Sequence, residues 1–350
     1  MKTGITLQQL AAQIEANSTA KKDYIADTRS LTVTDDLNLA LKNGTEQYFT
    51  IGEVAHDGLA GFSGIPNKYY EKMQRGAPAL LAANLNHWLH ETHARRTVRT
   101  LRGEARAFLS DRYQRIDNDE VASVIMPVLA GVPGLRCESA QITERRMYMK
   151  FVTDRVQGEV KKGDVVQAGV MISNSEVGCG ATTITPLVFR LVCLNGMALP
   201  DARVRGYHVG RRAAEGEDVY QLLSDETRRA DDKAILLKSR DVVKAALDDA
   251  FFKKQIERMQ ELATGSRIEG DPVMAVQELG KAVGLTKDEG TSVLRHLIEG
   301  GDLTAWGMLN AVTRASQDVE SYDRATALEI AGGKVLELNR NEWQRIRMAA

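Results

Sequence analysis

Arginine is the residue whose type and spacing carry the strongest chemical signal in this chain. The stretch from His93 to Arg115 holds seven arginines and no lysine, and only Glu104 and Asp111 oppose their charge. Each guanidinium is planar, permanently charged and able to bind two phosphate oxygens at once. Because the net charge of the whole chain is -1, phosphate binding must come from a local patch of this kind.

We therefore predict that this segment contacts nucleic acid, with Tyr113 as a stacking platform beside the arginines. The other interpretation is a charged surface hairpin whose arginines are balanced by acidic residues elsewhere in the chain. The predicted contact residues of the segment are Arg95, Arg96, Arg99, Arg102, Arg106, Arg112, Tyr113 and Arg115.

A second segment repeats the combination of basic residues and a tyrosine. In RRMYMKFVT, residues 145–153, apolar and polar residues alternate as they do in a half-buried strand. Met147, Met149 and Phe151 share one face of this strand. The other face carries Arg146, Tyr148 and Lys150, which we expect to line the same groove as the arginine segment.

The sequence SNSEVGCGA, residues 173–181, separates two β-branched runs and is rich in small residues. Small residues let backbone N–H groups approach a ligand, and Asn174 and Ser175 can add hydrogen bonds. Glu176 does not suit a phosphate cradle, and there is no P-loop lysine. Ligand contact and a plain hairpin turn both remain open for this loop.

Two further groups of residues raise the question of metal binding. The carboxylates of DNDE, residues 117–120, suit either a Mg²⁺ site or the N-terminus of the following helix, and the helix cap is the simpler interpretation. The histidines of NHWLHETH, residues 86–93, do not share one helix face or match HExxH. We expect no metal at the histidines, because no cysteine or carboxylate cluster completes a site there. We also expect no catalytic residue, because no nucleophile triad is present, and no cofactor.

Residues 276–304 imitate a helix-turn-helix, with a Gly-Leu-Thr turn between two helical patterns. The second helix would begin with Asp288 and Glu289, where phosphates would have to lie. An αα-hairpin within a helical bundle is therefore favoured over a DNA-reading motif.

The local patterns predict the elements that must position these residues. Residues 5–17 have helical spacing, residues 96–110 indicate two short strands around a turn, and residues 117–131 indicate an acid-capped helix. Residues 164–196 indicate an antiparallel hairpin around the SNSEVGCGA loop. Beyond about residue 215 the chain consists of helix formers.

We predict an α+β fold with a mainly antiparallel central sheet and a helical C-terminal domain. The expected domains are a small α+β lobe over residues 1–80, the basic sheet domain over 81–215 and the helical domain over 216–350. The chain has 350 residues and three dispersed cysteines, no apolar leader and no run long enough to span a membrane. A cytoplasmic protein without membrane contact is therefore expected.

Four segments resemble the signature segments of a known prokaryotic family. They are residues 105–121, 173–178, 189–197 and 304–318, they occur in the family's order, and the likeness spans roughly residues 60–335. The family is described as phage/plasmid-like proteins with domain of unknown function 932. This resemblance implies an origin in mobile elements and phages but does not imply a particular chemistry.

A second likeness concerns architecture. A basic hairpin, a helix and a curved antiparallel sheet look similar to the core of phage single-strand annealing proteins. That resemblance implies a protein that holds the phosphates of one strand in a basic groove and needs no active site. Fold likeness alone does not establish function.

Together these observations predict a single-stranded-DNA-binding protein that promotes strand annealing and recombination. Binding is expected to be sequence-tolerant and salt-sensitive. We expect a homo-oligomer, with a ring as one form, because the edges of such a sheet need covering. Two rival hypotheses remain open: a Mg²⁺-dependent nuclease that uses Asp117 and Asp119, and a regulator that binds a host or phage protein.

Overall fold

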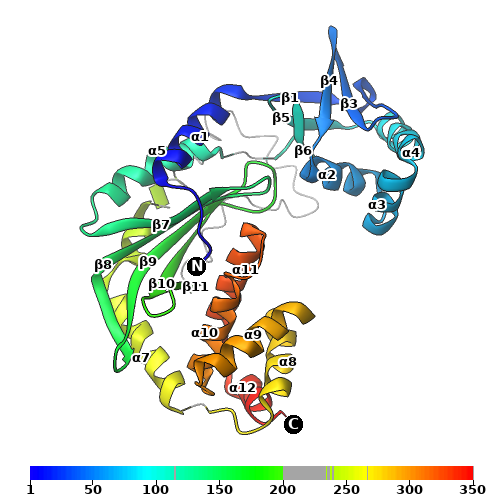
Figure 1. The fold of residues 1–350 in the computed structure, drawn as a ribbon. Helices are drawn as coiled ribbons and strands as arrows, with labels where there is room; N and C mark the ends of the chain where they lie inside the picture. Colours follow the sequence, from blue (N-terminus) through cyan, green and yellow to red (C-terminus); the bar gives the residue numbers. More distant parts are fainter. Residues whose placement is uncertain (114–115, 200–233, 235–236, 239, 266, 350) are drawn as a thin grey trace.

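The computed structural model describes the chain except residues 114–115, 200–233, 235–236, 239, 266 and 350. It confirms the α+β class, with two separate sheets and a helical C-terminal region. Figure 1 shows these parts along an arc, with the first sheet and its helices at upper right, the second sheet at left and the C-terminal helices below. The predicted boundary at residue 215 lies outside the described residues.

Residues 21–110 form what we call the first lobe, built on a six-stranded sheet with strand order β1-β5-β6-β4-β3-β2. All neighbouring strands are antiparallel except β4 and β6, which pair in parallel over two residues. The strands are β1 (Lys21–Asp27), β2 (Leu31–Val33), β3 (Asn38–Asn43), β4 (Thr45–Ile51), β5 (Arg95–Leu101) and β6 (Glu104–Ser110).

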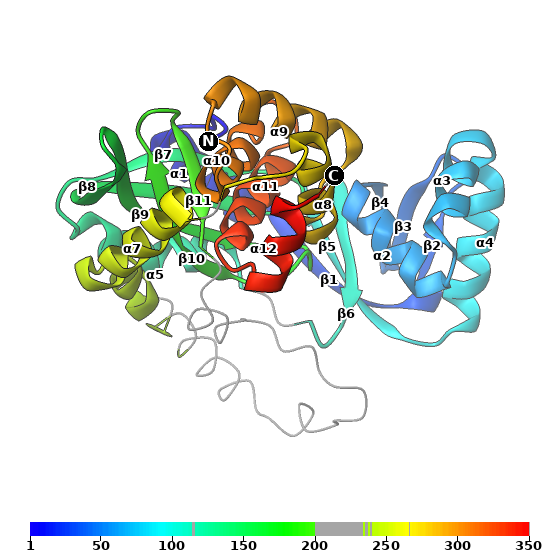
Figure 2. The same cartoon turned by 90° about the horizontal axis from the view of Figure 1, so that it is seen from below.

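Three helices cover one face of this sheet, and Figure 2 shows them at the right of the view, on the opposite side from the second sheet. They are α2 (Glu53–Ser63), α3 (Asn67–Gly76) and α4 (Pro78–Glu91). In α4, Leu81, Leu85 and Leu89 recur at one turn's spacing and are buried, so the helix presents an apolar stripe to the sheet. Pro78 begins α4 at its first helical position, where a missing N–H costs no hydrogen bond.

The arginine segment forms the predicted hairpin of β5 and β6. Its turn is made by Arg102 and Gly103, both with left-handed backbone at φ values of 50° and 87°. A register shift between Arg99 and Thr100 interrupts the pairing. The hairpin joins β1 and β4 in the first sheet, while the predicted domain boundary at residue 80 stays a prediction.

Residues 1–20 and the described residues of 116–349 are called the body here. Its sheet is an antiparallel meander of five strands in the order β11-β10-β9-β8-β7. The strands are β7 (Leu135–Ile142), β8 (Met147–Lys161), β9 (Asp164–Asn174), β10 (Thr183–Arg190) and β11 (Asn195–Ala198). The predicted hairpin around SNSEVGCGA is confirmed as β9 and β10.

Helices cover both faces of the body sheet. On one face, α1 (Leu7–Ala20) and α5 (Asn118–Ala130) pack with Met147, Met149 and Phe151 in one core, as the alternation of β8 predicted. Thr6 caps α1 and Asp117 caps α5, each within a capping box. On the other face, Val166, Ala168 and Val188 pack against the C-terminal helices.

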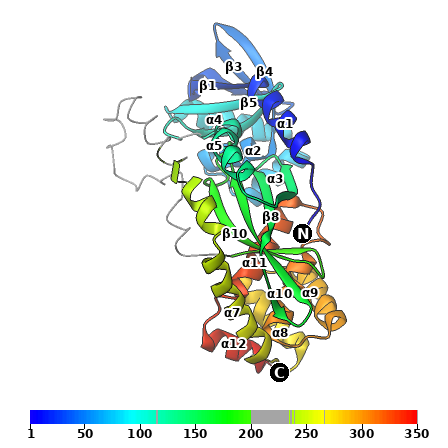
Figure 3. The same cartoon turned by 90° about the vertical axis from the view of Figure 1, so that its left-hand side faces the viewer.

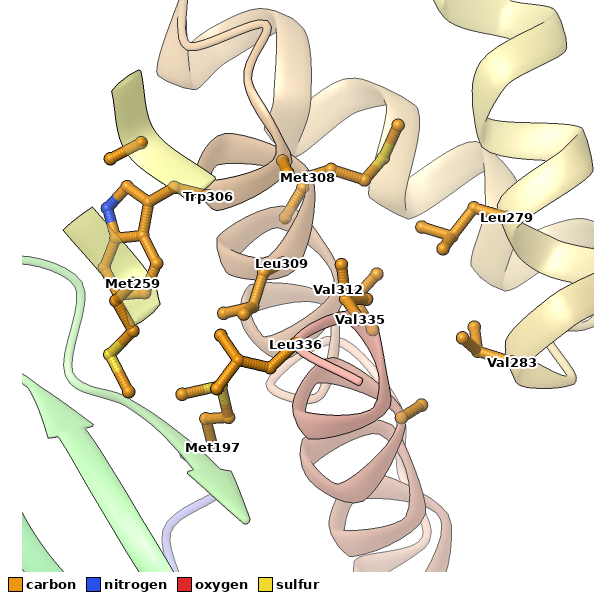
Figure 4. Packing of buried hydrophobic residues seen from close by; sticks show 14 of the residues in the cluster. Met197, Met259, Leu279, Val283, Trp306, Met308, Leu309, Val312, Val335 and Leu336 are labelled. Atoms are coloured by element: carbon orange, nitrogen blue, oxygen red, sulfur yellow. The ribbon is translucent and has the colours of Figure 1, made fainter. Parts of the chain in front are cut away.

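The C-terminal helices form a bundle below the sheet (Figure 3). They are α7 (Asp249–Gly265), α8 (Pro272–Val283), α9 (Lys287–Gly300), α10 (Ala305–Ala315), α11 (Tyr322–Val335) and α12 (Arg340–Arg347). Figure 4 shows Trp306, Met308, Leu309 and Val312 of α10 at the centre of this core. The α8–α9 pair is an αα-hairpin in which Glu289 is bound by Arg324 of α11, 2.6 Å away.

No helix among the described residues is both long and apolar enough to cross a lipid bilayer.

Candidate functional site

Arg99 lies in the interior of the molecule, where the first lobe meets the body. Its side chain is 0% exposed and its guanidinium binds the Asp23 carboxylate through Nε and Nη2, at 2.9 and 3.2 Å. The same Nη2 lies 2.6 Å from Asp117 Oδ1, and Nη1 donates to the carbonyl oxygen of Glu176 at 2.6 Å. All three nitrogens of this group are therefore engaged by the protein itself.

Two further cations complete the arrangement around Asp117. Lys21 Nζ lies 2.6 Å from Asp117 Oδ2 and 2.9 Å from Asp119 Oδ1. Arg106 Nη1 lies 2.8 Å from Glu176 Oε2. We call this set the junction network, and its members are Lys21, Asp23, Arg99, Arg106, Asp117, Asp119 and Glu176.

Local structure explains why these side chains meet. The β1–β5 register places Asp23 directly opposite Arg99. Asp117 is the N-cap of α5, and the next residue, Asn118, donates its backbone N–H to Glu176 Oε1 at 2.9 Å. Asn174 holds this turn against the loop by donating to the carbonyl of Ile116 and to Asn118 Oδ1, both at 2.9 Å.

Charge pairing governs the ionisation of the network. Burial disfavours the carboxylate form of Asp117, but the Arg99 and Lys21 cations outweigh that effect and hold its pKa below the usual range. The pKa of Asp119 is lowered in the same way, because the hydrogen bonds from Lys21 and Ser18 outweigh burial. Asp117 and Asp119 are therefore carboxylates at neutral pH.

The carboxylates of Asp117, Asp119 and Glu176 form the group among the described residues that could hold a metal ion, with ligand oxygens within 4.8 Å of one another. Oxygen ligands in this number suit Mg²⁺. Each of the six oxygens already accepts from a protein group: Lys21, Arg99, Arg106, Ser18 or a backbone N–H. The protein thus neutralises this cluster with its own cations.

The remaining arginines of the segment lie nearer the surface. Arg95 is exposed, and Arg96 is partly buried with its guanidinium carbon 4.7 Å from the centroid of the Phe62 ring. Neither forms an ion pair with any residue that the structure describes. Arg112 is also exposed and lies two residues beyond Ser110, the β6 partner of Arg96. We call Arg95, Arg96 and Arg112 the hairpin-end arginines.

Of the other predicted contact residues that the structure describes, Arg102 lies away from this surface, and Tyr113, Asn174 and Ser175 are engaged within the molecule. Arg102 is exposed at the turn, the opposite end of β5, and Arg115 lies outside the described residues. Tyr113 is partly buried and donates to the carbonyl of Ser175 at 3.1 Å. The loop residues Asn174 and Ser175 are 1% and 3% exposed; Asn174 holds the start of α5, and Ser175 binds the backbone of Arg145 and of its own loop.

The basic face of β8 is covered by α11. Lys150 is 0% exposed and lies 2.7 Å from Glu329 Oε2, and Tyr148 donates to Asp323 Oδ1 at 2.7 Å. Arg146 is partly buried and donates to Ser173 Oγ at 2.6 Å and to the carbonyl of Cys179 at 3.1 Å. The structure therefore does not bring these residues together with the hairpin-end arginines on one surface.

A cleft of about 700 Å³ opens between the first lobe and the body. Glu53 of α2 forms one side, and the turn between β7 and β8 and the start of α11 form the other. Its charged lining is mixed, with Lys2, Glu53, Glu144, Arg145, Glu320, Asp323 and Arg324. Such a balance does not by itself select a phosphate ligand.

Sequence reasoning missed Lys21 and Asp23 and discounted Glu176. Two of the three partners of Arg99, Asp23 and Glu176, lie 76 residues before it and 77 residues after it, so no local pattern identifies them. The one local signal was the acidic DNDE sequence, which was correctly assigned to a helix cap.

The four signature segments meet in pairs. Residues 105–121 and 173–178 build much of the junction network, through Arg106, Asp117 and Glu176. Residues 189–197 and 304–318 meet where Gln317 donates to the carbonyl of Cys193 at 3.2 Å. The four segments therefore lie in two regions: the junction network, and the contact between the end of the body sheet and α10 with the turn that follows it.

A family model described as "Domain of unknown function (DUF932)" matches residues 106–343. No curated protein and no solved structure was found to match the chain. The likeness to single-strand annealing proteins therefore stays a prediction.

Proposed function

The chain belongs to the DUF932 family, a domain of unknown function, and from its own residues we propose that it binds single-stranded DNA and promotes strand annealing. The hairpin-end arginines are the proposed contact surface. The observation that carries the proposal is that Arg95 and Arg96 form no ion pair among the described residues, whereas Arg99 and Arg106 of the same hairpin do. Without an ion-pair partner among the described residues, the charges of Arg95 and Arg96 are available to phosphate.

The geometry of Arg96 favours this role. Its position over the Phe62 ring fixes the plane of the guanidinium, so it loses less conformational freedom when it binds phosphate oxygens. Arg95 precedes it, and Arg112 follows the strand paired with it. The proposed surface is therefore the end of one hairpin rather than a groove along its length.

A surface of this size contacts few phosphates, so one chain should bind weakly. We propose that several copies act together on one strand as a homo-oligomer, with a ring as one form. Each added copy contributes its own phosphate contacts, which raises the affinity of the assembly without a new kind of interaction.

The test is a fluorescence-anisotropy titration of labelled single- and double-stranded oligonucleotides. The test variant is Arg95→Ala/Arg96→Ala/Arg112→Ala. A charge-matched control, Lys68→Ala/Lys72→Ala/Arg75→Ala, removes three exposed cations from α3. We expect the test variant to bind single strands about tenfold more weakly than wild type, while the control binds nearly as wild type does.

An annealing assay with complementary strands then separates annealing from binding alone. We expect wild type to accelerate duplex formation and the test variant to lose that acceleration. Failure of wild type to bind any single strand at low salt would refute the proposal. In that case capture of a host or phage protein would support the regulator hypothesis.

The nuclease hypothesis is favoured by one observation, the proximity of Asp117, Asp119 and Glu176. It requires Mg²⁺ to displace Lys21 or Arg99 from these carboxylates. Cleavage of DNA that needs Mg²⁺ and is lost in a folded Asp119→Asn variant would support this second candidate. Intact DNA after incubation with wild type and Mg²⁺ would count against it.

A further inference from the structure

The first lobe is joined to the body by two chain crossings that lie close together. One runs from α1 into β1 at residues 20–21, and the other leaves β6 after Ser110 and reaches α5 at Asn118. Lys21 and Asp117, which flank these crossings, are bound to each other in the junction network. The covalent links and the buried ion pairs therefore coincide at one place, as a hinge requires.

Away from this hinge, the lobe and the body share a small hydrophobic cluster. The loop after β9 packs Val177 against Val54 of α2 and Ala107 of β6, with Leu109 and Cys179 at the edge of this cluster. Ser175 Oγ fixes the loop by donating to the carbonyl of Arg145 at 2.8 Å and accepting from the N–H of Cys179 at 2.9 Å.

Ion pairs at the surface cover this contact. Arg145, in the turn between β7 and β8, binds Glu53 and lies 3.0 Å from Asp57 Oδ2, both on α2. Its Nη1 also lies 3.9 Å from Cys179 Sγ. The side chains of Arg145, Glu53 and Asp57 are 37%, 61% and 53% exposed, whereas Arg99 at the hinge is 0% exposed.

We propose that the Arg145–Glu53–Asp57 ion pairs are a salt-sensitive gate that holds the first lobe closed against the body. Exposed pairs are weak and screened by salt, whereas buried pairs are screened much less. Glu53 and Arg145 also line the cleft of about 700 Å³, so opening the gate widens that cleft. The lobe then turns about the junction network, which stays intact.

Cys179 provides a direct readout, because it is partly buried beneath Arg145 at this contact. The chain has two other cysteines, so the test uses the Cys137→Ser/Cys193→Ser background. The rate of Cys179 alkylation by N-ethylmaleimide, a neutral reagent, is measured in the full chain. Glu53→Gln weakens the gate by removing one of the two carboxylates that bind Arg145, and it leaves Arg145, which contacts the thiol, unchanged.

At low salt we expect Glu53→Gln to be alkylated about two- to fivefold faster than the parent. Raising the salt to about 0.5 M, where screening is strong, should bring the parent close to the variant. The control is Glu71→Gln, which removes an exposed pair with Arg75 inside the first lobe. It should leave the rate unchanged.

Equal alkylation rates for Glu53→Gln and the parent at low salt would overturn the gate. A rate that rises equally in Glu71→Gln would also overturn it, because general loosening of the lobe would then explain the effect. Urea unfolding midpoints of the variants identify such loosening. The result is independent of DNA binding, since the assay contains no nucleic acid.

Discussion

The arginines of the β5–β6 hairpin differ in burial and in ion pairing, and this difference decides whether each one stabilises the fold or is available to a ligand. Arg99 is fully buried among Asp23, Asp117 and the carbonyl of Glu176, whereas Arg95 is exposed without an ion pair among the described residues. Removing one partner of a buried ion pair leaves the other charges uncompensated, which is more costly than losing a surface charge.

We therefore predict that Arg99→Ala lowers the free energy of unfolding by about 3–5 kcal/mol. Arg95→Ala should change it by no more than about 0.5 kcal/mol. Urea denaturation followed by circular dichroism measures both. Similar losses in the two variants would mean that Arg99 is not held as the structure has it.

The sequence could identify these arginines but not separate them. Alternation along β5 shows that neighbouring residues face opposite sides, yet only the β1–β5 register shows that Asp23 lies opposite Arg99. The same holds for Lys150. The sequence correctly placed it on the face of β8 opposite Met149, but its ion-pair partner Glu329 lies 179 residues away and could not be identified. An ion pair between residues far apart in the sequence produces no pattern in the sequence around either residue.

At the scale of elements, the loop after β9 depends on one glycine. Gly178 has a φ of 84°, and a Cβ placed there would lie 2.6 Å from Leu109 Cδ2. Gly44, in the β3–β4 turn, has a φ of 76° and open space around it. Gly44→Ala therefore isolates the cost of left-handed backbone from the cost of crowding.

We predict that Gly44→Ala destabilises the protein by about 1 kcal/mol and Gly178→Ala by about 2 kcal/mol. In the Cys137→Ser/Cys193→Ser background, Gly178→Ala should also speed alkylation of Cys179. Thermal unfolding gives the stabilities. Equal destabilisation by the two substitutions would show that Leu109 moves aside without cost.

The start of α5 should make stability depend on pH. The pKa of Asp117 is lower in the folded chain than the value of about 3.9 that an unfolded chain has. Its contribution to stability is therefore complete above that unfolded value and is lost as the pH falls through the folded pKa.

Accordingly, acidification from pH 6 to pH 3 should destabilise wild type more than Asp117→Asn, which has no carboxylate to protonate. Urea midpoints at several pH values measure this difference. Parallel loss of stability in the two proteins would contradict the assigned charge pairing around Asp117.

Local signals predicted most elements near the site. The helix over residues 5–17, the acid-capped start of α5, the β5–β6 hairpin and the β9–β10 hairpin are all confirmed. The edge strand β7 was not predicted, and α11 and α12 were predicted only as part of a helical C-terminal domain. Helix α11 carries buried polar residues, Thr326 and Glu329, which weaken its apolar periodicity because they serve Lys150 instead.

At the scale of the whole molecule, the α+β class followed from the order of strand and helix signals, but the division of strands between two sheets did not. Strands β5 and β6 follow α4 in sequence, yet they pair with β1 and β4 rather than with β7–β11. Long-range register decides such pairing, and it depends on partners that a single sequence does not mark.

The proposed DNA-binding surface and the proposed gate lie at different places in the fold. The hairpin-end arginines lie at the end of β5 and β6, whereas the gate spans α2 and the β7–β8 turn (Figure 1). We expect Glu53→Gln to alter Cys179 alkylation without removing the DNA contacts. DNA binding and lobe opening can therefore be tested separately.

The central claim is that phosphate contacts at the hairpin end hold single-stranded DNA. The most direct measurement is the slope of log Kd against log salt concentration for wild type and Arg95→Ala/Arg96→Ala/Arg112→Ala. Each lost phosphate contact reduces the magnitude of that slope by about 0.7 on a single strand, so the variant should be shallower by about 2. A variant slope equal to that of wild type would contradict the account, because the arginines would then make no phosphate contacts.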